Sequence, residues 1–258
     1  MAAVRRLTTS ALFFTAVAVA TTACGASGGG THPPAASLSP TAVADPLAGW
    51  SAQRIEKQSA TDTLAARYVR ITGTGTDSGQ QVAFDLTMVV GVGCRGTISE
   101  HGAGSFLLVS KGKTVWIQPD AAFWKQEAGQ NPSTSQQLLE QLFAGKYLED
   151  KVGTGLGSLA SMCSLHSLFG SSALSAPSTP LKKAGTAVID GQRELKLIST
   201  DAKQPGYAYV SDTAKPEILQ MTVPGPGGGS LSFTYYATAP AITPPPASET
   251  IDGSKYGF

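Results

Sequence analysis

The residues best suited to chemistry in this chain of 258 residues are its three cysteines, Cys24, Cys94 and Cys163. A cysteine thiolate can be acylated, oxidised to a disulfide, or used as a nucleophile. Cys24 follows a short apolar segment and opens a stretch rich in glycine, serine and proline, whereas the other two cysteines lie within patterns typical of folded structure. These positions predict a different chemistry for Cys24 than for the remaining pair.

The segment before Cys24 has the layout of a secretory signal. Arg5 and Arg6 form a basic region, and residues 11–20 form an apolar region. The apolar run is shorter than the roughly 20 residues that a transmembrane helix needs. We therefore expect export, and no later apolar run is long enough to indicate a second membrane segment.

Small residues directly precede Cys24, as in a bacterial lipobox, although Thr21 stands where that motif usually carries leucine. This similarity predicts a signal peptide over residues 1–23 and acylation of Cys24, for example with palmitate. More than one acyl chain would anchor the protein stably. The expected location is therefore the outer face of the cell membrane. The alternative is an ordinary signal peptide cleaved near Ala23 or Ala26.

Cys94 and Cys163 are expected to form a disulfide, because an exported compartment can be oxidising. The bond would close a loop of about 70 residues and stabilise the fold by roughly 4 kcal/mol. Two buried free thiols are the alternative. A metal site is disfavoured, because neither cysteine has a nearby CxxC or HxxxH partner.

Composition narrows the class of protein. The chain carries 19 basic and 18 acidic residues, and Arg5 and Arg6 would leave with the signal. Such a balanced domain has no strong field for nucleic acid. The low charged fraction of 14%, with abundant glycine and proline between short β-branched and aromatic runs, indicates a single secreted β-rich domain. We expect it to be a monomer.

Signals for catalysis are weak, and we expect neither an enzyme nor a cofactor. His32 lies in the glycine-rich stretch, His101 in an expected turn, and His166 among apolar residues of an expected helix. No GxSxG motif occurs in the folded domain expected over 45–250. The glycines of residues 153–157 imitate a nucleotide loop but lack the GK[ST] that follows in a P-loop. A secreted hydrolase using His166 or a carboxylate pair is the least favoured alternative.

Periodicity divides the remaining chain into a flexible tether (24–44), a folded domain (45–250) and a C-terminal tail (251–258). A helix is expected over 45–66, with Asp45 as its cap. Helical spacing recurs over 135–146 and 156–169. Alternation predicts strands at 68–75, 81–90, 94–100, 104–110, 114–118, 186–189, 194–199, 207–210, 217–223 and 231–236. Short links between many of these strands favour antiparallel pairing.

Most of the folded part resembles actinobacterial lipoproteins of the LolA-like, LppX/LprG-related fold. The similarity is carried by Cys24, Gly93-Cys94-Arg95-Gly96-Thr97-Ile98, Asp120 to Lys125, Ile189-Asp190-Gly191-Gln192 with Leu195 and Leu197, Tyr207 to Val210, and Lys215-Pro216. The resemblance implies an α+β fold: a curved antiparallel β half-barrel whose concave face is covered by helices, preceded by a disordered tether. It also implies a role in binding or carrying lipids without catalysis.

The resemblance places an apolar ligand cavity between the sheet and the helices. The residues expected there are Phe84, Leu86, Met88, Leu139, Leu142, Phe143, Leu159, Leu195, Leu197, Leu219, Met221, Leu231 and Phe233. The same side chains could instead pack against one another and leave no hollow. The expected partners are the membrane, through Cys24, and a lipid or glycolipid. A ligand-free interaction lipoprotein with an exposed aromatic patch near Phe123 and Trp124 is the alternative.

Overall fold

In the computed structural model, the described residues are 45–77, 79–128, 134–153, 155–169, 180–189 and 191–256. They belong to one compact unit, Ala44–Phe258. The predicted signal peptide, Cys24 and the tether lie outside the described residues. Among the described helices, none is long and apolar enough to cross a membrane.

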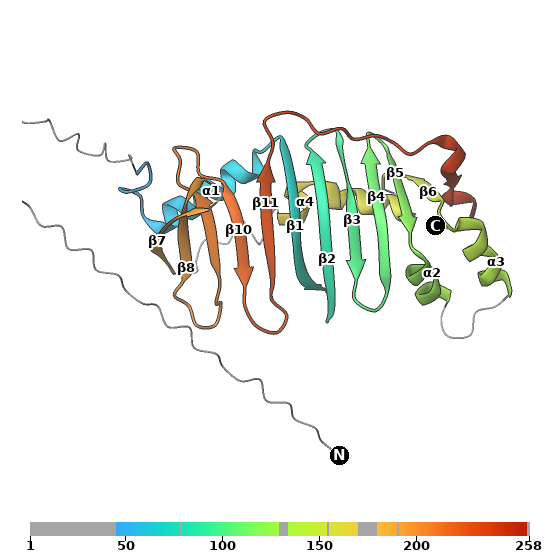
Figure 1. Cartoon of the computed structure of the whole chain (residues 1–258), viewed down its shortest axis with the longest axis horizontal. Helices are drawn as coiled ribbons and strands as arrows, with labels where there is room; N and C mark the ends of the chain where they lie inside the picture. The colour runs from blue at the N-terminus through green and yellow to red at the C-terminus, as the bar shows by residue number, and fades with distance from the viewer. Residues whose placement is uncertain are drawn as a thin grey trace, which may run out of the picture. The chain divides into compact units, whose positions relative to one another are not determined.

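The unit is built on one open, curved and mostly antiparallel sheet of twelve strands in the order β12-β6-β5-β4-β3-β2-β1-β11-β10-β9-β8-β7 (Figure 1). The strands are β1 (Tyr68–Asp77), β2 (Gln80–Val89), β3 (Gly93–Glu100), β4 (Gly104–Lys111), β5 (Thr114–Pro119), β6 (Tyr147–Lys151), β7 (Leu181–Ile189), β8 (Gln192–Ser199), β9 (Tyr207–Ser211), β10 (Ile218–Val223), β11 (Gly229–Tyr235) and β12 (Thr250–Asp252). The α+β half-barrel predicted from the sequence is therefore correct.

Two meanders meet at the centre of this sheet. The first five strands pair in sequence order, because short turns join them. The strands β7 to β11 form a second series, and β11 then pairs with β1, with Val69 opposite Tyr235 and Ile71 opposite Phe233. This pairing places the two halves of the chain in one continuous surface.

The helices are α1 (Ala52–Leu64), α2 (Ala121–Ala128), α3 (Thr134–Phe143) and α4 (Leu165–Phe169), with 3-10 segments η1 (Gly155–Cys163), η2 (Ala247–Glu249) and η3 (Gly253–Tyr256). In Figure 1, α1 lies behind the half of the sheet formed by β7 to β10, and α4 lies behind its centre. Buried side chains of the sheet and of these helices form one core cluster.

Cross-strand rows of apolar side chains explain which face is covered. Ile71 lies opposite Phe233 on one side and Leu86 on the other, and Leu108 lies opposite Ile117 in the same face of the sheet. All five side chains are at most 5% exposed. Period-two alternation puts such residues on a single face, so the predicted inner face of the early strands is correct.

Two glycines interrupt these rows where strands pass close together. Gly73 lies between Leu231 and Phe84, and Gly96 lies between Leu86 and Leu108. A Cβ atom at either glycine would collide with a backbone carbonyl of the adjacent strand. Glycine inside a strand often marks a bend or a close backbone approach, and the close approach is what these two positions show.

Several elements differ from the prediction. The first helix begins at Ala52 rather than near Asp45, because Ser51 Oγ accepts the Arg54 N–H at 3.2 Å and serves as the cap. Asp45 instead accepts the Leu47 N–H at 3.0 Å in a local turn. The region 156–169 is split into η1 and α4, and β6 was not predicted.

The predicted tail boundary at 250 also differs from the structure. Thr250–Asp252 pairs in parallel with Tyr147–Glu149 of β6, and Ile251 packs against the core. The segment 236–249 leading to it runs along one end of the strands from β11 to β6 (Figure 1). Ile242 in this segment packs with Val89, Val109 and Trp116 on the face opposite the main core. The fold therefore continues beyond 250.

Candidate ligand cavity

An apolar hollow of about 600 Å³ lies between α1 and strands β8 to β10. Its lining includes α1, the start of β7, and the loops that follow β8 and β10. The lining residues are Glu56, Ser59, Ala60, Leu181, Leu197, Ser199, Lys203, Gln204, Pro205, Gly206, Tyr207, Ala208, Val210, Ile218, Met221, Thr222, Val223, Pro224, Gly225 and Pro226. The volume is within the range of about 300–1,000 Å³ typical of small-molecule pockets.

The strand register explains the apolar wall of this cavity. Ala208 lies between Leu197 on β8 and Met221 on β10, so three core-facing side chains adjoin across three strands. Ala208 is small, and neighbouring side chains leave unfilled space beside it. Val210 and Ile218 continue the wall and are 1% and 5% exposed. An apolar ligand would be shielded from water here.

A bulge shapes the same wall. The pairing of β9 with β10 shifts between Ile218 and Gln220. Ile218 faces the core, whereas Leu219 is not among the residues packed against it. Leu219 instead helps to line a separate pocket with Gln192 and Glu194. Simple alternation through Leu219 and Met221 therefore gave the wrong face for Leu219, because a bulge inserts an extra residue.

The helix α1 is fixed over the cavity by buried hydrogen bonds. Thr63 Oγ1 accepts the Ile218 N–H at 2.9 Å, and Tyr235 Oη donates to the Ile218 carbonyl at 2.6 Å. The Thr63 and Tyr235 hydroxyls are 3.1 Å apart. Burial raises the pKa of Tyr235 far above its ordinary value, so the phenol stays a donor. These bonds satisfy backbone groups that the bulge leaves outside the strand ladder.

Polar groups occupy one part of the lining. Burial raises the pKa of the Glu56 carboxyl. Thr222 Oγ1 is enclosed and has no hydrogen-bond partner among the described residues. The exposed Lys203 lies in the loop after β8. A cavity with an apolar wall and a few polar groups suits a ligand with an apolar body and a polar end.

The thirteen residues expected at the cavity do not all meet there. Leu197 and Met221 line it. The side chains of Leu86, Met88, Phe143, Leu195 and Phe233 are at most 5% exposed and belong to the packed core. Phe84, Leu159 and Leu231 are partly buried against that core. The hollow is thus confined to the α1 half of the sheet.

Three of the residues expected at the cavity, Leu139, Leu142 and Phe143, come from α3. Leu142 is 47% exposed, whereas its neighbour Phe143 is fully buried. The side chain of Leu139 lies outside the described residues. Phe143 packs on Trp124 with ring centroids 5.4 Å apart. Phe143 thus belongs to a packed aromatic group. Leu142 lies on the exposed side of the helix.

That aromatic group includes Phe123, which lies 5.7 Å from Trp124 and 6.1 Å from Phe106 between ring centroids. Trp124 is 7% exposed. The exposed aromatic patch expected here by the interaction-protein alternative is therefore absent at these two residues, because their rings are used in packing.

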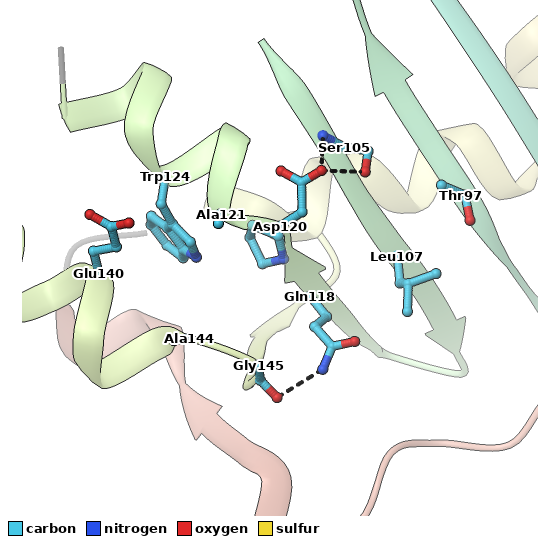
Figure 2. A pocket seen from close by; sticks show the side chains of 11 residues that line it. Thr97, Ser105, Leu107, Gln118, Asp120, Ala121, Trp124, Glu140, Ala144 and Gly145 are labelled. Carbon is cyan, nitrogen blue, oxygen red and sulfur yellow. Dashed lines mark hydrogen bonds between the residues drawn. The ribbon is translucent and has the colours of Figure 1, made fainter. Parts of the chain in front are cut away.

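A smaller pocket of about 380 Å³ lies beside α2 and α3 (Figure 2). Asp120 accepts hydrogen bonds from Ser105 N, Ser105 Oγ and Phe123 N at 3.0, 2.7 and 2.7 Å. Gln118 Nε2 donates to the Gly145 carbonyl at 2.8 Å. Among the polar side chains visible in Figure 2, Asp120 thus caps α2 and Gln118 joins a loop to the sheet.

The structure joins Cys94 and Cys163 in a disulfide, with Cα atoms 5.2 Å apart. Cys94 is on β3 and fully buried. Cys163 ends η1, so the bond links that segment to the sheet as the sequence analysis expects. Opposite Cys94 lie Met88 and Ser110.

The structure offers no constellation for catalysis at the histidines. His101 and His166 are both exposed, in a turn and on α4. Within the described ranges, no group of three or more His, Cys, Asp or Glu side chains could hold a metal ion. The residues 153–157 precede and begin η1, and Gly157 N–H donates to Asp150 Oδ2 at 3.2 Å.

Comparison with known proteins gives the following. No family model and no curated protein matches the sequence. Among solved structures, the chain is similar to the Mycobacterium tuberculosis lipoprotein LppX, with 13% identity over 74% of this chain and 98% of that one and a TM-score of 0.45. It is similar to LprF from Mycobacterium bovis, with 14% identity over 75% and 96% of the chains and a TM-score of 0.44.

A domain assigned to outer membrane lipoprotein sorting in Vibrio parahaemolyticus has 10% identity over 73% of this chain and 95% of that one, with a TM-score of 0.21. The fold itself rests on the strand order and register described above.

Proposed function

We propose that this protein is an extracytoplasmic lipoprotein that binds a lipid or another apolar ligand in the cavity beneath α1. The observation that carries the proposal is the 600 Å³ hollow with its apolar wall of Leu197, Ala208 and Met221. Burial of apolar ligand surface there would contribute about 25 cal/mol per Å². Binding needs no side-chain chemistry, which is consistent with a non-catalytic role.

Attachment to the membrane belongs to the same proposal. Acylation of Cys24 would hold the domain on the outer face of the membrane, and residues 24–44 would act as its tether. The signal features before Cys24 support this location. A ligand taken from a membrane would then have only a short distance to travel.

The direct test is extraction of the exported full chain carrying Cys24→Ser, purified without detergent, followed by mass spectrometry of bound lipids. We expect a lipid at close to one molecule per chain. The matched variant Ala208→Leu, which fills the cavity, should lose it. A wild-type cavity that neither retains a lipid nor acquires one from vesicles would refute the proposal.

A further inference from the structure

The volume of the cavity limits the number of acyl chains that its ligand can have. This inference rests on the proposed function. At about 30 Å³ per non-hydrogen atom, which is the volume of a water molecule in the liquid, 600 Å³ holds roughly 20 atoms. That is one chain of about 16 carbons with a small head group. A diacyl phospholipid has roughly 50 such atoms and needs more than twice that volume.

Core side chains fill the neighbouring part of the covered face. Beyond Met221 and Leu231, the rows across β1 to β5 are filled by core side chains such as Ile71, Leu86 and Leu108, all fully buried. Phe169 of α4 packs on Phe233 with centroids 5.7 Å apart. Close-packed interiors accommodate added atoms only at a cost.

The polar residues that line the cavity indicate which ligand head group would bind there. The Glu56 carboxyl lines the cavity and makes no ion pair among the described residues. An ionised carboxylate only accepts hydrogen bonds. A hydroxyl group on a ligand could donate a hydrogen bond to Glu56, whereas a ligand carboxylate would repel it.

We propose that the cavity selects single-chain amphiphiles with a neutral, hydroxyl-bearing head group, represented by a monoacylglycerol, and excludes lipids with two chains. The apolar chain would lie along Leu197, Ala208 and Met221, and the hydroxyls would lie near Glu56. The ligand would enter from the side of the exposed Lys203 loop.

The test is a displacement assay on the exported full chain carrying Cys24→Ser, with a fluorescent single-chain probe and three competitors: 1-palmitoylglycerol, palmitate and dioleoyl phosphatidylethanolamine. We expect palmitoylglycerol to compete about tenfold better than palmitate, since like charges oppose binding. Phosphatidylethanolamine should not compete. Glu56→Gln should narrow the difference between the two single-chain ligands, and the exposed control Glu249→Gln should leave it unchanged.

Each result separates the two proposals. Competition by phosphatidylethanolamine as strong as that by palmitoylglycerol would overturn the single-chain inference and leave lipid binding intact. Equal competition by palmitate and palmitoylglycerol, unaffected by Glu56→Gln, would overturn the head-group assignment. Failure of the probe and every competitor to bind would overturn the proposed function itself.

Discussion

The Thr63 hydroxyl accepts the backbone N–H of Ile218 at 2.9 Å, although the two residues are 155 positions apart. Thr63 is fully buried near the end of α1, and Ile218 begins β10 at the bulge. One side chain thus joins the roof of the cavity to its wall. An unsatisfied buried donor costs about 1–3 kcal/mol.

We therefore expect Thr63→Val to lower the free energy of unfolding by about 1–3 kcal/mol, because the isosteric valine removes both the acceptor of the Ile218 N–H and the hydrogen bond with the Tyr235 hydroxyl. Urea denaturation followed by circular dichroism would measure it. Thr61→Val, in the same helix but exposed, is the control. A Thr63→Val variant as stable as the wild type would show that water or a shifted helix replaces the bond.

The cavity wall gives a second prediction. Ala208→Leu adds atoms to the hollow and should reduce lipid binding at least severalfold, while changing stability little. Ala83→Leu on the opposite face of the sheet, between Thr74 and Ser99, is the matched control. Binding of a fluorescent lipid probe would be titrated for both. Equal binding by Ala208→Leu and the control would place the ligand elsewhere.

Arg193 and the buried Asp212 form an ion pair, with Nε 2.6 Å from Oδ2 and the Asp212 side chain 1% exposed. Arg193→Ala should cost about 3 kcal/mol, since it leaves a buried carboxylate unpaired. Burial, with the nearby charge of Asp45, raises the pKa of Asp212 even in the presence of Arg193.

A carboxyl with a raised pKa stabilises the fold at pH values below its unfolded pKa, and this contribution is lost as pH rises through the folded pKa. Removing Arg193 should raise that pKa further. The urea midpoint of Arg193→Ala should be lower than that of the wild type, and this difference should shrink as the pH is lowered from 7 toward 4. A deficit that stays constant over this range would contradict the assignment, and Arg193→Ala/Asp212→Asn should abolish the pH dependence.

Asp120 should show the opposite pH dependence. Burial raises its pKa, but hydrogen bonds from Phe123 and Ser105 outweigh this and leave the pKa below its ordinary value. The ionised Asp120 therefore stabilises the fold at pH values above the unfolded pKa of about 3.9, and this stabilisation is lost as the pH falls. Asp120→Asn should lower the melting temperature at pH 7 more than at pH 3, as scanning calorimetry would measure. An equal loss at both values would exclude a role for the charge.

The disulfide and Cys24 can be separated by mutation. The loop closed by Cys94 and Cys163 spans 69 positions, so Cys163→Ala with Cys94→Ala should cost about 4 kcal/mol. Cys24→Ser should leave stability unchanged and release the protein from the membrane fraction. Calorimetry and fractionation would measure the two effects. Retention of the Cys24→Ser protein in membranes would disprove the proposed anchor.

The sequence predicted the strands with regular alternation because period two is a local signal. Val82, Phe84, Leu86 and Met88 identify one face of β2 without knowledge of any partner. It did not identify β6, since Tyr147–Lys151 is short and charged, or β12, which forms only against β6. The bulge that displaces Leu219 also has no local pattern.

The cavity residues could be predicted only in part, because residues of the same type can lie in a filled region or beside a hollow. Leu86 and Leu197 have the same residue type and strand context, yet one is in a filled region and the other beside a hollow. Part of that difference is the cross-strand neighbour: Ile71 of β1 lies opposite Leu86, although Gly96 of β3 lies on its other side, whereas Ala208 lies opposite Leu197. The size of facing residues requires the register, which the sequence alone does not contain.

The pairing of β12 with β6 and of β11 with β1 has a consequence for biogenesis. Residues 68–151 precede both partner strands in the sequence, so an intermediate in which only β1 to β6 have paired leaves one edge of β1 and one edge of β6 without a partner. Such open edges promote association between chains. Both edges are covered only when β11 and β12 pair with them, so aggregation during folding should be greatest before that step.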